Sequence, residues 1–156
     1  MAEYRKAAAW LAGLLLVSGA PGPSAAAEPP TAVLSVAGVW ARATPPGASV
    51  GGAYFVILNP GSEDKLLRID SPVATTAAIH QMSMKGGIMQ MRPVESVRVP
   101  AHGQVQFTPE SLHVMLMGLK QPLVEGQHFP MTLVFQNAGS IHVNVVVKGF
   151  GAEEGS

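Results

Sequence analysis

Residues 80–91 read HQMSMKGGIMQM, two short alternating runs on either side of the pair Gly86-Gly87. Alternation over this length is typical of a half-exposed β-strand, and a two-residue glycine turn is typical of a β-hairpin. Such a turn pairs even positions with odd ones, and paired residues share a face; a three-residue turn would divide them. The stretch therefore predicts a hairpin with one face formed by His80, Met82, Met84, Met89 and Met91.

Short β-type runs of this kind recur along the chain, separated by Gly, Pro, Asn and Asp, with no helical period and no internal repeat. We predict strands at residues 34–36, 39–43, 52–58, 65–69, 77–83, 88–92, 96–99, 104–107, 113–117, 131–135 and 141–147. Many short strands at this spacing favour an all-β fold, either a β-sandwich or a small Greek-key barrel. Residues 150–156 are expected to be a loose end.

The first 27 residues predict an export signal. Arg5 and Lys6 precede an apolar run over residues 7–17, which is too short for a membrane span of about 20 residues. Three alanines ending at Ala27 offer a cleavage site. We expect an exported, periplasmic protein whose residues 28–156 form one domain, with a retained N-terminal anchor as the alternative.

Charge and cysteine content narrow the class of protein. Ten basic and ten acidic residues balance, and no basic stripe or polybasic segment predicts nucleic-acid or lipid binding. The chain has no cysteine, so it lacks the thiolate that blue-copper electron carriers use. Six of its eight methionines instead lie between positions 82 and 117, in company with two of its five histidines.

Residues 112–117, LHVMLM, carry the second group of these side chains. On a strand the even positions would face the core, while the odd positions His113, Met115 and Met117 would share the opposite face. Thioether sulfur is a soft ligand suited to Cu(I), and imidazole also binds copper. A single methionine is more often core filler, and a Met-rich surface for promiscuous binding is the plainer interpretation. The remaining histidines are interpreted as structural or exposed: His102, His128 and His142.

The spacing of these residues resembles the periplasmic copper chaperone family (PCu(A)C-like) that supplies the CuA centre of cytochrome c oxidase. That family has a histidine, ten intervening residues, a methionine, twenty-one intervening residues, then His-x-Met. The chain matches each step through His80, Met91, His113 and Met115. Further similarity lies in the segments 40–42 (WAR), 45–47 (PPG), 52–54 (GAY), 89–93 (MQMRP) and 113–119 (HVMLMGL).

The resemblance implies a cupredoxin-like Greek-key β-sandwich or barrel that is a monomer and not an enzyme. It implies one Cu(I) per chain, held by His80, Met91, His113 and Met115. The implied partners are the CuA domain of cytochrome c oxidase subunit II and a thiol-reducing copper assembly protein. The other methionines would relay the ion, shield it or pack: Met82, Met84, Met89 and Met117. Some relatives hold a second copper in a His/Met-rich C-terminal tail, which the ending GFGAEEGS does not resemble.

Three rival interpretations remain. A periplasmic copper buffer or resistance protein would use the same ligands without a dedicated target. A metallohydrolase usually needs a general base, and Glu95 and Glu110 have no motif around them. An adhesion domain would bind no metal.

Because histidine must be neutral to bind a metal, ligation by His80 and His113 predicts that Cu(I) affinity falls in mild acid.

Overall fold

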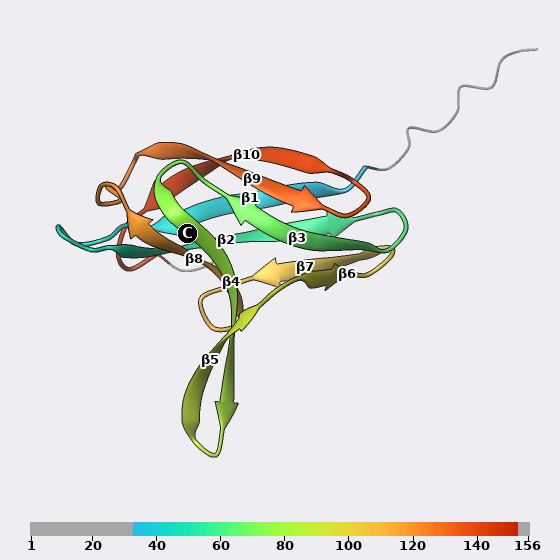
Figure 1. The fold of residues 1–156 in the computed structure, drawn as a ribbon, viewed down its shortest axis with the longest axis horizontal. Coiled ribbons are helices and arrows are strands. Elements are labelled where there is room, and N and C mark those ends of the chain that lie inside the picture. Colours follow the sequence, from blue (N-terminus) through green and yellow to red (C-terminus); the bar gives the residue numbers. More distant parts are fainter. Residues whose placement is uncertain (1–32, 153–156) are drawn as a thin grey trace, which may run out of the picture.

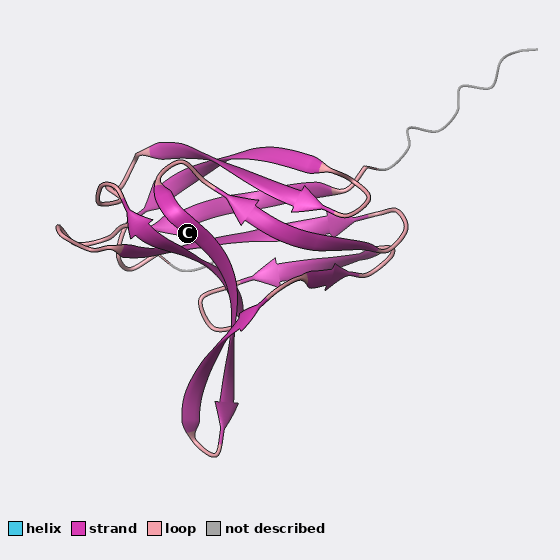
Figure 2. Cartoon of the chain, in the orientation of Figure 1, coloured by secondary structure: helices cyan, strands magenta, loops and turns pink. Residues whose placement is uncertain are grey.

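The computed structural model describes residues 33–152 (Figure 1). Within this range the chain forms strands, turns and loops, with no helix (Figure 2). No segment of these residues is therefore a helix with the length and apolarity that crossing a membrane requires. The predicted export signal, residues 1–27, lies outside the described residues.

Each predicted strand overlaps an observed one, with bounds that differ by a few residues, and two of the predicted strands fall on the same observed strand. The strands are β1 Ser35–Arg42, β2 Val50–Asn59, β3 Asp64–Asp70, β4 Ala74–Lys85, β5 Ile88–Val94, β6 Val97–Val99, β7 Gly103–Phe107, β8 Leu112–Leu119, β9 His128–Phe135 and β10 Ser140–Lys148. The prediction of two strands before residue 44 is wrong, because β1 is continuous. It contains an irregularity at Gly38, where φ is 59° and the register against β2 shifts between Ala37 and Trp40.

The strands form one mixed, ten-stranded sheet in the order β5-β4-β8-β7-β2-β1-β10-β9-β3-β6. Two further pairings, β4 with β3 and β8 with β2, bring the sheet back onto itself and close a barrel. The pairs β1–β10 and β7–β8 are parallel, and the others are antiparallel. The predicted all-β architecture is confirmed, and of the two predicted forms, sandwich and barrel, the sheet takes the closed one. The far end of the β4–β5 hairpin extends away from the body of the barrel (Figure 1).

Alternation along the strands determines which side chains fill the barrel. Val145 and Val147 of β10 are fully buried, as is Leu133 on the adjacent strand β9. Phe55 of β2 stacks on Phe107 of β7 with ring centroids 4.3 Å apart. Burial of each such side chain stabilises the fold by roughly 1.5–3 kcal/mol. This core gives the chain a rigid barrel without a disulfide bond.

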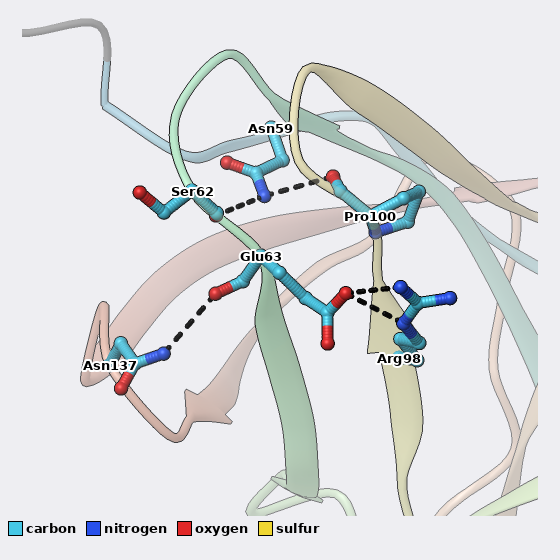
Figure 3. A network of polar contacts seen from close by, with 6 residues as sticks. All are labelled: Asn59, Ser62, Glu63, Arg98, Pro100 and Asn137. Carbon is cyan, nitrogen blue, oxygen red and sulfur yellow. Dashed lines mark hydrogen bonds and ion pairs between the residues drawn. The ribbon is translucent and has the colours of Figure 1, made fainter.

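The turn between β2 and β3 is held by polar contacts (Figure 3). The side-chain amide of the buried Asn59 donates to the carbonyl oxygens of Ser62 at 2.7 Å and Pro100 at 3.0 Å. Beside it, the guanidinium of Arg98 donates to the carboxylate of Glu63 through Nε at 2.7 Å. This ion pair lies at the surface, where such pairs contribute little to stability. The buried amide therefore does more than the ion pair to fix this turn.

Asp64 is buried at the first position of β3. Its carboxylate accepts hydrogen bonds from the backbone N–H groups of Lys65, Asn137 and Ala138, at 2.7, 2.9 and 2.8 Å. Burial alone would raise the pKa of this carboxyl, but the backbone hydrogen bonds outweigh it and lower the pKa below its ordinary value. The ionised carboxylate therefore links the start of β3 to the turn between β9 and β10.

Substituting Asp64→Asn should lower the free energy of unfolding by about 1–3 kcal/mol at neutral pH, since backbone donors lose a charged acceptor. Because the folded-state pKa is depressed, the wild-type advantage is present above the unfolded-state pKa of about 3.9 and disappears as the pH falls through the folded-state pKa. Urea unfolding at neutral and acidic pH measures both values. The control is Asp70→Asn, at an exposed carboxylate. A deficit of the same size at both pH values would contradict this role.

Candidate metal centre

The β4–β5 hairpin closes through the two-residue turn Gly86-Gly87, with φ of 61° and 75°. Positive φ at both central positions defines the type I′ turn, which glycine adopts without strain. Lys85 and Ile88 pair directly across it, so the predicted two-residue loop is confirmed. The resulting register places the predicted set on one face: His80, Met82, Met84, Met89 and Met91.

Strand β8 continues this face on the other side of β4. His80 pairs directly with His113, and Ala78 pairs with Met115. The two imidazole rings lie nearly parallel, with their centroids 6.1 Å apart and their planes 23° apart. The predicted core positions Val114 and Leu116 are fully buried on the opposite face of β8. Two histidines that are 33 positions apart in the sequence thus become neighbours.

His113 is buried although it lies on the outer face, with 6% of its surface exposed. Its Nδ1 lies 3.2 Å from the carbonyl oxygen of Ser111. A carbonyl can only accept, so Nδ1 carries the hydrogen, and in the neutral imidazole Nε2 then has the lone pair. Metal-binding histidines usually have one ring nitrogen held in this way, which orients the other toward the metal.

His80 differs from His113, because one of its ring nitrogens is buried without a hydrogen-bond partner. Its Nδ1 is buried and has no hydrogen-bond partner, one of two such side-chain nitrogens in residues 33–152. A buried polar atom without a partner costs about 1–3 kcal/mol of stability. A metal ion bound at this nitrogen would remove that cost. The donor set therefore fits a metal at the position where His80 and His113 meet.

The two predicted thioether ligands flank this pair of histidines. Met115 is half-buried and follows His113 by two positions on the same face of β8. Met91 lies on β5 and pairs with Met82, two residues nearer the hairpin turn than the pair of His80 with Pro93. The exposed fraction of Met91 is 48%. The fold thus brings three predicted ligands together on adjacent strands, and Met91 stands at the solvent side of the group.

The chemistry of these donors is soft. In the part of the chain that the structure describes, no three His, Cys, Asp or Glu side chains gather as a metal-binding group. The side chains that gather are two imidazoles and several thioethers. Thioether sulfur selects Cu(I), whereas carboxylate oxygen suits Mg²⁺ and Ca²⁺.

A shallow hollow opens beside the β8 end of this group. Its volume is about 400 Å³, and Arg42, Tyr54, His113, Met115 and Phe150 are among its lining residues. Burial raises the pKa of the Tyr54 hydroxyl, an effect that Arg42 partly opposes, so Tyr54 stays a neutral phenol at pH 7. Because His113 and Met115 line this hollow, these two candidate donors are reached from this side of the barrel.

The wall of this hollow was not predicted to be near the metal site. Trp40 packs on Tyr54 with ring centroids 4.6 Å apart. Arg42 donates to the carbonyl oxygen of Ala152 at 3.0 Å, and Ala152 is buried against the two aromatic rings. The prediction of a loose end from residue 150 is therefore wrong for Ala152. Alternation could have placed Trp40 and Arg42 on one face of β1, but it could not have placed Arg42 in a hollow shared with His113 and Met115 of β8.

The three histidines interpreted as structural lie elsewhere. Nδ1 of His142 is 2.9 Å from the hydroxyl of Thr132, on the adjacent strand β9. His128 is the first residue of β9. His102 lies in a turn with φ of 51°. Their positions agree with the prediction that they are separate from the candidate site.

A closed β-barrel of this kind is the cupredoxin-like fold of PCuAC domains. The copper-bound PCuAC domain from PmoF2 matches it with a TM-score of 0.63 and 20% identity, over 74% of this chain and 92% of that one. The solution structure of CuI-DR1885 from Deinococcus radiodurans matches with a TM-score of 0.59 and 28% identity, over 78% of this chain and 81% of that one. The cupredoxin-like fold that the resemblance implied is thereby confirmed.

The chain belongs to the LpqE-like family ("Putative lipoprotein LpqE-like"), which it matches over residues 34–147. It is also 33% identical over 124 residues to "Putative lipoprotein Lxx21020" of Leifsonia xyli subsp. xyli, covering 78% of this chain and 74% of that protein. Together with the structural matches, the family assignment confirms the predicted resemblance to PCuAC-like copper chaperones.

Proposed function

We propose that this protein binds one Cu(I) and delivers it, outside the cytoplasm, to the CuA centre of cytochrome c oxidase subunit II. The ligands would be His80, Met91, His113 and Met115. The observation that carries the proposal is the direct pairing of His80 with His113, where Nδ1 of His80 is buried without a partner. The copper in the PmoF2 domain and the Cu(I) in DR1885 support the choice of metal.

The proposed activity is transport rather than turnover. The barrel holds the two imidazoles in place, and the hydrogen bond to Ser111 leaves Nε2 of His113 ready to bind. Two thioethers make the site favour the reduced ion. The exposed Met91 would be the ligand that a partner replaces first. A target whose ligands include cysteine thiolates binds Cu(I) more tightly, so the ion would move toward it.

Transfer to the target tests this function. We expect the Cu(I)-loaded protein, mixed anaerobically with the metal-free, reduced CuA domain of subunit II, to lose its copper to that domain. Copper is measured in each protein after separation. The control supplies the same free Cu(I) concentration from a small-molecule chelator. Faster loading by the protein than by the chelator supports delivery. Equal rates would favour a copper buffer, and copper retained by the loaded protein would exclude delivery.

A further inference from the structure

We propose that the exposed end of the β4–β5 hairpin is a second soft-metal site, in which the thioethers of Met84 and Met89 bind a monovalent ion of the Cu(I) class. This site is separate from the pair His80 and His113. Its binding of a soft ion stands on its own evidence, and only its role as an entry point for copper rests on the proposed function.

The register places the donors within reach of one ion. Met84 pairs directly with Met89, and Met82 pairs directly with Met91. Directly opposed residues have Cβ atoms about 4.5–5.5 Å apart, so two flexible thioethers can converge on an ion between them. The next pair on the same face lies two residues along, at about 3.3 Å per residue. The four methionine side chains therefore start from a compact two-by-two array of positions on one face of the hairpin.

Packing does not explain these methionines. The exposed fractions of Met84, Met89 and Met91 are 67%, 64% and 48%. By contrast, Met131 on β9 is 1% exposed and fills the core in the ordinary way. The hairpin extends away from the barrel, so within residues 33–152 no other strand lies over its far end (Figure 1). A single exposed apolar side chain is ordinary, but a contiguous exposed group of them usually marks a binding site.

The composition of this face favours a metal over a protein partner. From the turn back to His80, the apolar side chains of the methionine face are all thioethers until Pro93. The aliphatic Ile88 pairs with Lys85 and belongs to the opposite face. A patch for protein contact could equally use leucine, isoleucine or valine. The charged residues of the hairpin, Lys85 and Arg92, also lie on the opposite face, so their positive charges do not stand beside a cation bound by the methionines.

The array leads toward the proposed copper site. Along the hairpin the pairs run from Met84 and Met89, through Met82 and Met91, to His80 and its partner His113. The exposed fraction falls along the same path, from 67% at Met84 to 6% at His113. Two thioethers alone should hold Cu(I) less tightly than a set that includes two imidazoles. An ion captured at the turn would therefore move inward along the face.

Methyl NMR with Ag(I) tests the site, because Ag(I) is a soft monovalent ion that is not redox-active here. The protein is labelled with ¹³C at the methionine methyl groups, and His113→Ala removes an imidazole of the inner site. In this variant we expect the methyl signals of Met84 and Met89 to shift and saturate with bound Ag(I). The buried Met131 supplies an internal reference whose signal should not move. Unmoved signals from Met84 and Met89 would overturn the proposal.

Stoichiometry supplies an independent measurement. The double variant Met84→Leu/Met89→Leu keeps the apolar volume and should lose the weaker bound equivalent of Ag(I) while keeping the tighter one. The matched control Ile88→Leu, on the opposite face of the same hairpin, should keep both. Two equivalents retained by the double variant would overturn the hairpin site. If instead the hairpin signals shift but His80 and His113 never bind, the proposed function fails and the hairpin site stands.

Discussion

Substituting His113→Ala should lower the Cu(I) affinity of the protein by at least about a hundredfold, the loss expected when a ligand or its immediate support is removed. The substitution removes the imidazole that the carbonyl of Ser111 orients. That imidazole lies directly across from His80, whose Nδ1 has no hydrogen-bond partner. Anaerobic Cu(I) titration against a competing chelator measures the change. Met91→Leu and Met115→Leu should each weaken binding as well, because a thioether is replaced by a side chain without a donor.

The matched control for this experiment is His142→Ala. His142 is also a strand histidine, but its Nδ1 contacts the hydroxyl of Thr132 on the adjacent strand β9. It should bind Cu(I) as the wild type does. If wild type, His113→Ala and Met91→Leu all bound Cu(I) with equal affinity and stoichiometry, these side chains would not be the ligands.

Phe107→Ala should lower the free energy of unfolding by about 3–5 kcal/mol, which is the usual cost of removing a buried aromatic ring. Phe107 is 2% exposed and stacks on Phe55 inside the barrel, with ring centroids 4.3 Å apart. Its removal leaves a cavity that the surrounding strands can fill only in part. Urea unfolding followed by tryptophan fluorescence or circular dichroism measures the loss.

Copper titration of the same variant separates stability from ligation. Phe107 ends β7, and the loop after it is fixed by the N–H of Thr108, which donates to the carbonyl of Leu112 at 2.7 Å. Below its unfolding transition the variant should still bind Cu(I), since its predicted ligands are intact. The control Phe150→Ala, at a side chain that is 63% exposed, should change stability by about 0.5 kcal/mol or less. A large loss of stability in the control would show that the exposed fraction of these two rings does not predict their contribution to stability.

Local patterns were enough to predict the hairpin. Alternation around Gly86-Gly87 depends only on the two-residue period of a strand and on the tolerance of glycine for positive φ. Both are properties of neighbouring residues, so the shared face of His80 and the hairpin methionines could be predicted before any fold was known. The same reasoning placed His113 and Met115 together on one face of their strand, opposite the buried Val114.

Burial was harder to predict than periodicity. The sequence placed His113 away from the packed interior, and the structure places it on the outer face yet only 6% exposed. The difference arises because the outer face of a barrel strand is covered by side chains from its neighbours, which alternation within one strand does not identify. For the same reason Arg42 and Tyr54 had no predicted place beside the site.

The amino-acid sequence by itself determined the strand pattern, the two-residue turn and which histidines and methionines share a face within the hairpin and within β8, because each depends on residues that are close in the chain. Only the tertiary structure decided that β4 lies against β8 with His80 opposite His113, and that β2 brings Tyr54 to the other side of that group. The physical reason is that strand order and register follow from the packing of the whole barrel core, which side chains from strands far apart in the chain fill together.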